Sequence, residues 1–538
     1  MPNVLARIDS KVADSVAFVI GVLVAGLSCF QGDSMLGDPF HQGEHFAAAV
    51  SYLAGSGARF HPLAIHGVLD VFPALLAERL TGAGNYFLAT EVIYCALNFA
   101  AAIALLAIAW ELLRSKPNRW LLLLVVGLVA PFVVGYRDLL LLTSLYLFVM
   151  ISGRNAAGPS GVLLKFGLGI AAAFGVFWSF DRGIAGTVAL GAGVLTMLPR
   201  GRTHAIPLVA FVATITVLAL CFDAFSLSNY LSNVRLLMDT SSQWRYVGQQ
   251  SALELSTFAL ALNSVALTLF VLESWRSGSF ERRVPQVLAF VLLALVLVKI
   301  GTNRADILHV YWALWVPMLA ALAFYGGTLK VRMAAVILVA VVLIAAIGVA
   351  RSYDDYAMLL VVALLGYATV SLLRLRHFQI VTAGLMVLIA CGLWSVAASS
   401  TNWLTGGRYA WIGRVLHSPA NEEVSPPPVV WVAERLREQG VNCVFDLTNS
   451  GLINGLVRRP SCSRFTYPVY ATTKYEQQLI DDLRAASPRA LVYSSGNWSY
   501  RIDGKPMNER FQALDRFILT NYPVEACSVG YCVRYARN

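Results

Sequence analysis

The chain has 538 residues, of which 57% are hydrophobic and 13% are charged, and its formal net charge is +10. Soluble domains carry about 25% charged residues, so this composition excludes an ordinary soluble protein. Apolar runs long enough to cross a bilayer recur between residues 14 and 398. They predict a mainly α, polytopic helical membrane protein, because helices satisfy the backbone hydrogen bonds within lipid. The basic residues lie in short loops between these runs, which indicates membrane orientation and argues against nucleic acid as a partner.

The apolar runs predict thirteen membrane spans. No small-residue cleavage site follows the first run, so we expect it to be retained as a helix. Basic loops alternate along the chain, and the positive-inside bias then predicts a cytoplasmic N-terminus. The four cysteines of the exported tail suggest the cell inner (plasma) membrane as the location. An odd number of spans places the C-terminal tail on the periplasmic side. The predicted spans are 14–30, 86–112, 119–135, 139–152, 162–178, 184–198, 205–222, 255–273, 285–301, 309–325, 332–350, 357–373 and 378–398.

The tail predicts a small exported α/β domain. The domain boundaries we expect are 1–398 for the transmembrane domain with its first outer loop at 31–85, 399–428 for a linker containing NEEVSPPP, and 429–538 for the tail. Helices at 430–438, 475–486 and 508–520 are expected to alternate with strands at 443–447 and 490–494 and with a final strand or hairpin at 531–535. Four of the eight cysteines lie here, which predicts two disulfides. Their number leaves the pairing open, and we expect Cys527 with Cys532 and Cys443 with Cys462.

The most polar stretch of the chain is residues 32–70, which holds four of its eight histidines. Asp38 and Glu44 are the candidate catalytic acids, since a carboxylate near the membrane is costly without a role or a partner. The segment 41–45 matches H-x-x-E-H, the signature of inverted zinc proteases. That motif needs a continuous helix, which Gly43 weakens, and no third ligand stands in a matching context. The cofactor is therefore unassigned, with a divalent metal held by Asp38, His41, Glu44 or His45 as one possibility.

Two further features of the outer loops bear on function. Residues 43–53 and 68–80 read as amphipathic helices lying along the membrane interface. Nearly every short outer loop pairs an arginine with an aspartate, and such pairs either neutralise one another or hold a lipid phosphate. The candidate substrate-binding and phosphate-binding residues are Arg304, Asp306, His309, Arg137, Asp138, Asp181, Arg182, His66 and Asp70.

The first outer loop holds, in order, an acidic segment, a helix that ends in Gly, an aromatic-Pro segment and a further helix before the second span. Together with thirteen spans and an exported C-terminal domain, this order resembles the GT-C superfamily of integral-membrane glycosyltransferases. The likeness is nearest to protein O-mannosyltransferases and to the aminoarabinose and galacturonic acid transferases of lipid A. It implies a polyprenyl-phosphate-linked sugar donor, a lipid or glycan acceptor, and transfer on the periplasmic side. The family usually has Asp-Glu or Asp-x-Asp before the interfacial helix. Here Gly43-Glu44 stands there with Asp38 upstream, so the resemblance leaves open which acid is the base.

The expected chemistry needs a base for the acceptor hydroxyl and cations for the phosphate leaving group. We rank Asp38 before Glu44 as the base, and Arg304 before Arg137 and Arg182 as the phosphate ligand, because related enzymes engage the phosphate in a late loop. An O-antigen-type polymerase or ligase would carry its large outer loop between late spans. A transporter or flippase would place ionisable residues in mid-membrane and show repeats. Nothing singles out a membrane acyltransferase using His309.

Overall fold

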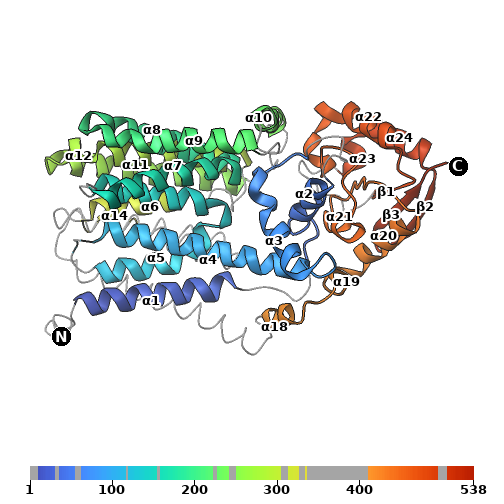
Figure 1. The fold of residues 1–538 in the computed structure, drawn as a ribbon, viewed down its shortest axis with the longest axis horizontal. Coiled ribbons are helices and arrows are strands. Elements are labelled where there is room, and N and C mark those ends of the chain that lie inside the picture. Colours follow the sequence, from blue (N-terminus) through green and yellow to red (C-terminus); the bar gives the residue numbers. More distant parts are fainter. Residues whose placement is uncertain are drawn as a thin grey trace. The chain divides into compact units, whose positions relative to one another are not determined.

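The structure is a computed structural model in which the described residues form two compact units (Figure 1). The first unit comprises residues 1–31, 95–217 and 249–406, and the second comprises residues 32–94, 218–248 and 407–538. The residues that the structure describes are 10–30, 36–54, 62–114, 116, 119–153, 158–221, 227–241, 250–304, 313–325, 332, 334–335, 338, 410–494 and 506–537.

The first unit is built from long apolar helices. Eight segments of the described chain are long and apolar enough to cross a membrane. Nine predicted spans, from 14–30 to 285–301, coincide with helices, and part of the tenth is helical, while nearly all of the last three lies outside the described residues. The helices are α1 (Ser10–Cys29), α4 (Phe87–Leu112, which begins in the second unit), α5 (Arg119–Val133), α6 (Leu139–Gly153), α7 (Pro159–Trp178), α8 (Phe180–Met197), α9 (Ile206–Cys221), α11 (Gln250–Arg276), α12 (Phe280–Arg304) and α14 (Trp315–Phe324), with 3-10 turns at Tyr136–Asp138, Leu198–Arg200 and Arg202–Ala205.

Close backbone approach holds the first of these helices in place. α1 packs along α5, and the two helices meet at Gly21 and Gly127. A Cβ atom at Gly127 would collide with the backbone of Gly21, so a larger residue would push the helices apart. Small residues are the usual means by which membrane helices approach closely enough for extensive van der Waals contact. The fold class predicted from composition, a mainly helical polytopic membrane protein, is confirmed.

The second unit combines short helices with a three-stranded sheet. Its antiparallel strands β1 (Ala490–Tyr493), β2 (Val524–Ser528) and β3 (Tyr531–Tyr535) lie in the order β1-β3-β2. Its helices are α2 (Glu44–Leu53), α3 (Phe72–Thr81), α10 (Leu227–Ser241), α18 (Ala410–Leu416), α19 (Asn421–Val424), α20 (Pro427–Glu438), α21 (Leu452–Val457), α22 (Glu476–Ala486), α23 (Met507–Arg510) and α24 (Gln512–Asn521), with 3-10 turns at Val68–Val71, Pro468–Ala471 and Thr473–Tyr475.

The tail elements largely follow the prediction. The expected helices at 430–438 and 475–486 and the strands at 490–494 and 531–535 are confirmed, and the helix expected at 508–520 is split at Phe511. The strand expected at 443–447 is wrong, because this segment makes only isolated bridges, through Val444 and Asp446. β2 forms a hairpin with β3 but lies before the range 531–535 in which a final strand or hairpin was expected. Both expected disulfides are present, Cys443–Cys462 and, between the facing residues of β2 and β3, Cys527–Cys532.

The first outer loop belongs to the core of the second unit. Phe40, Ala47 and Leu63 share one apolar cluster with tail residues such as Phe465. Residues 44–51 of α2 are all buried, so α2 lacks the exposed polar face that the amphipathic prediction required. The physical reason is that α2 packs against α21, where Gly43 and Gly451 approach so closely that a Cβ atom on either would collide with the other's backbone.

The segment that the sequence suggested as a stiff linker is also packed. Asn421 is buried. Its side-chain Nδ2 donates to the backbone carbonyl of Ala83, and its side-chain Oδ1 accepts the backbone N–H of Phe87. Val424 is buried as well, and its carbonyl accepts the N–H of Leu36. These bonds fix both ends of the first outer loop to the segment 421–424 within one unit.

Candidate functional site

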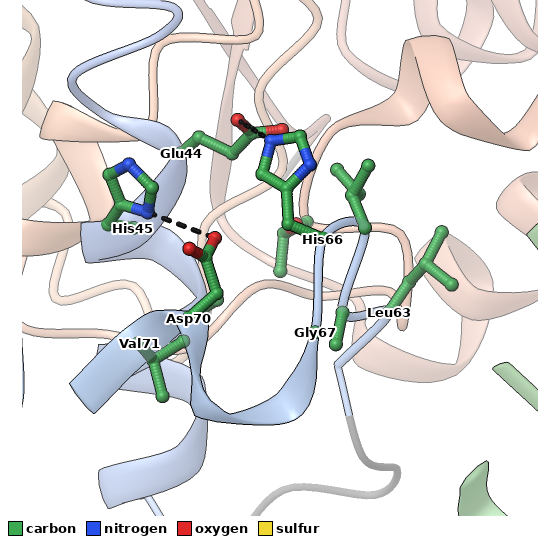
Figure 2. Close-up of a pocket in the computed structure, with 11 residues that line it drawn as sticks. Glu44, His45, Leu63, His66, Gly67, Asp70 and Val71 are labelled. Atoms are coloured by element: carbon green, nitrogen blue, oxygen red, sulfur yellow. Dashed lines mark hydrogen bonds and ion pairs between the residues drawn. The ribbon is translucent and has the colours of Figure 1, made fainter. Parts of the chain in front are cut away.

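Four titratable side chains from the first outer loop gather around a small cavity in the second unit (Figure 2). Glu44 and His45 lie at the start of α2, His66 lies in the following loop, and Asp70 lies in the turn before α3. Glu44 Oε2 is 3.1 Å from His66 Nε2, and His45 Nδ1 is 3.2 Å from Asp70 Oδ2. The cavity leaves about 10 Å³ for the centre of a water molecule, which is room for about one water.

Two tyrosines fix these pairs. The hydroxyl of Tyr470, in the tail, donates to Glu44 Oε1 at 2.9 Å, so both oxygens of this carboxylate are engaged. The hydroxyl of Tyr94 donates to the backbone carbonyl of Asp70 at 2.7 Å, and its ring centroid lies 4.3 Å from that of His45. The cluster therefore draws on α2, the loop after it, the first turns of α4 and the tail.

Charge pairing outweighs burial in this cluster. Burial acts to raise the pKa of Glu44, but the nearby charges of His66 and His45 and the hydrogen bonds of His66 and Tyr470 prevail, and they lower that pKa to about 2. Burial likewise opposes ionisation of Asp70, yet His45 lowers its pKa. The pKa of His45 is raised, since Asp70 and Glu44 outweigh the effect of burial. Glu44 and Asp70 are thus carboxylates at neutral pH.

Asp38, the first-ranked acid, lies outside this cavity. Its side chain is 54% exposed, Oδ2 is 2.6 Å from His41 Nδ1, and Oδ1 accepts the backbone N–H groups of Phe40 and His41. The hydrogen bond of His41 lowers the pKa of Asp38, although burial acts against this. Asp38 thereby shapes the turn that precedes α2, whereas Glu44 enters the buried cluster.

The predicted metal ligands are divided between different partners. His41 precedes α2, so His41 and His45 do not share the continuous helix that the H-x-x-E-H motif requires. Asp38 pairs with His41, while Glu44 and His45 face His66 and Asp70. Within the described ranges, the one trio of potential ligand atoms close enough for a metal is Glu525, Cys527 and Cys532, and its cysteines form a disulfide. The metal site stays a prediction.

Arg137 and Arg182, which lie in loops predicted to face outward, form ion pairs. Arg182 is 2% exposed and contacts Asp138 at 3.0 Å and Asp181 at 3.1 Å. Arg137 contacts Asp181 at 2.8 Å. These pairs match the neutralising interpretation of the arginine–aspartate loops. The backbone of Arg304 ends α12, and its side chain, like Asp306 and His309, lies outside the described residues.

The main contribution that the sequence reasoning missed is Tyr470. It stands in the aromatic run 465–470, which reads FTYPVY. Buried tyrosine hydroxyls usually have a hydrogen-bond partner, so this run was a signal for polar contacts inside the tail. Its neighbour Tyr467 accepts the N–H of Gly451 and donates to the carbonyl of Phe40 at 2.5 Å, which ties the tail to the turn before α2.

No protein-family model matches the chain, and no curated protein matches it by sequence. Among solved structures the chain is similar to ArnT from Cupriavidus metallidurans in the apo state, with 15% identity, a TM-score of 0.48 and 98% of each chain covered. It is similar to the same protein bound to undecaprenyl phosphate, with 13% identity, a TM-score of 0.43 and 98% and 97% coverage. It is also similar to the apo oligosaccharyltransferase of Archaeoglobus fulgidus, with 10% identity and a TM-score of 0.48, over 91% of this chain and 70% of that one.

Proposed function

We propose that this protein is a membrane glycosyltransferase that moves a sugar from a polyprenyl-phosphate-linked donor to an acceptor hydroxyl on the periplasmic face. The observation that carries the proposal is the buried cluster of Glu44, His45, His66 and Asp70 in the loop that follows the first span. Ionisable groups gathered in this way, with displaced pKa values, are typical of functional sites.

The cluster suits the removal of a proton from the acceptor. At 14% exposure His66 is the most accessible member, and Glu44 faces its Nε2 atom. A carboxylate in this position orients the imidazole, whereas Glu44 itself, with a pKa of about 2, is a weak base. We assign the base to His66, with Glu44 as its positioning partner. This assignment competes with the sequence-based choices of Asp38 and Glu44.

In the proposed step, the acceptor hydroxyl gives its proton to His66 as the acceptor oxygen bonds to the anomeric carbon. The bond between that carbon and the phosphate oxygen breaks, and the polyprenyl phosphate leaves with the electron pair. A guanidinium group can hold such a phosphate by two parallel hydrogen bonds. Since Arg137 and Arg182 already pair with aspartates, Arg304 remains the first choice for this role.

The test compares transfer by three variants, Asp38→Asn, Glu44→Gln and His66→Gln, in purified full-length protein of unchanged fold. Removing a general base costs roughly 10²–10⁴-fold in rate. We expect that loss for His66→Gln, a smaller loss for Glu44→Gln and near-native transfer for Asp38→Asn. If Asp38→Asn instead loses the most activity and His66→Gln the least, Asp38 is the base. Native transfer rates in all three variants would refute the proposal.

The phosphate site is tested separately. Arg304→Lys keeps the charge and loses the bidentate geometry, so we expect donor use to fall in this variant and to fall further in Arg304→Ala. Acceptor affinity should change little in either variant. Native donor turnover in Arg304→Ala would remove Arg304 from the proposal and direct the same test to the other outer arginines.

A further inference from the structure

A second cavity, in the first unit, is lined mainly by positive charge. It has a volume of about 550 Å³ and lies where α4, α6 and α14 end and α12 begins. Its size falls within the range of small-ligand pockets, about 300–1,000 Å³. Four cationic side chains and one carboxylate line it, namely Arg114, Lys116, Arg282, Arg283 and Glu111.

The cations differ in how far they are already engaged. Glu111 lies 4.0 Å from Arg114, and Arg283 donates to the carbonyl of Ala323 at 3.2 Å. The side chains of Lys116 and Arg282 have no hydrogen bond or ion pair with another residue in the part of the chain that the structure describes. The cavity therefore contains more positive charge than its own carboxylate neutralises.

Two further observations point to an anion. The pKa of Lys116 is lowered by burial and by the charges of Arg283 and Arg332, while Glu273 acts in the opposite direction, so an anion here would relieve an unfavourable environment. Gln286 and Ser152 also line the cavity, are hydrogen-bonded to each other at 3.0 Å, and supply neutral polar groups.

We propose that this cavity binds a phosphate group, and that a membrane lipid with an anionic headgroup supplies it. The cavity lies at the ends of helices apolar enough to cross a membrane, where headgroups are found. Basic pockets between transmembrane helices are known means of binding such headgroups. Its lining loops are among those that the positive-inside bias assigns to the cytoplasmic face. The same chemistry would also accept free phosphate, so the experiment has to separate the two sources.

The test measures lipid retention by native mass spectrometry on full-length protein taken from vesicles of phosphatidylglycerol or phosphatidylcholine. The variant is Lys116→Gln with Arg282→Gln. The matched control, Arg202→Gln with Arg276→Gln, removes the same charge from exposed positions in other basic loops that do not line the cavity. Thermal unfolding of both variants checks that the fold is retained.

We expect wild type and control to retain phosphatidylglycerol in preference to phosphatidylcholine. In the cavity variant its affinity should fall by at least about tenfold, since two charge-assisted contacts to the phosphate are removed. Equal retention by variant and control, or no preference for phosphatidylglycerol, would overturn the proposal.

In a second arm, inorganic phosphate is added. Displacement of the lipid only at far higher concentration supports a lipid source, while binding of inorganic phosphate alone, with the same variant dependence, keeps the phosphate site and overturns the lipid assignment.

Discussion

Replacing Tyr470 by Phe removes one hydroxyl and leaves the ring. Tyr470 is 4% exposed and donates at 2.9 Å to an ionised, buried carboxylate of Glu44. Hydrogen bonds to charged groups are worth about 1.5–3 kcal/mol, and His66 still serves the other oxygen, so we expect the unfolding free energy to fall by about 2 kcal/mol. The pKa of Glu44 should rise, because a donor to its charged form is lost. The rate of sugar transfer should also fall, because Glu44 would be held less well in its position beside His66.

The chain offers a matched control in Tyr475, whose hydroxyl donates at 3.1 Å to the solvent-accessible Asp239. Tyr475→Phe should have a clearly smaller effect, because solvent screens this contact. The assay is detergent-induced unfolding of the full-length protein, followed by tryptophan fluorescence, in a double-mutant cycle with Glu44→Gln. A coupling near zero between Tyr470 and Glu44, or equal effects of the two Phe substitutions, would refute the reasoning.

Three other predictions concern the tail disulfides, the charged pairs of the cavity and the ion pairs of Arg182. Mass spectrometry of non-reduced, alkylated protein should show the two tail disulfides, and Cys443→Ser should lower stability by about 2–4 kcal/mol; four free thiols would contradict this. The unfolding midpoint should be highest between about pH 4.5 and 6.5: the lowered pKa of Glu44 contributes stability that is lost as the pH falls from 4.5 toward 2, and the raised pKa of His45 contributes stability that is lost as the pH rises above 6.5. Glu44→Gln should flatten the acid limb of this profile, and an unchanged limb would assign it to other groups. Arg182→Gln should cost about 3–5 kcal/mol by leaving the buried carboxylate of Asp138 without its ion pair, and adding Asp138→Asn should recover part of it; an additive loss would count against the ion pair.

The sequence by itself determined the class of protein and the kind of residues at the site. Apolar runs of span length have few folds open to them, since lipid forces the backbone into helices, and α1, α4 and α7 lie where the runs placed them. The polar loop after the first span also stood out, because titratable groups such as Glu44 and His66 are costly near a membrane unless they act or pair.

Only the tertiary structure decided which of these residues meet. Amphipathic spacing predicted that α2 lies at the membrane interface, but residues of the tail cover it. A local sequence pattern cannot indicate a contact with a residue more than 400 positions away. The same contact brings Tyr470 to Glu44 and leaves Asp38 exposed in a turn. The tertiary structure also decides which charged groups pair. His66 lies beside Glu44, and Asp181 lies beside Arg137, at distances of about 3 Å that sequence spacing does not encode.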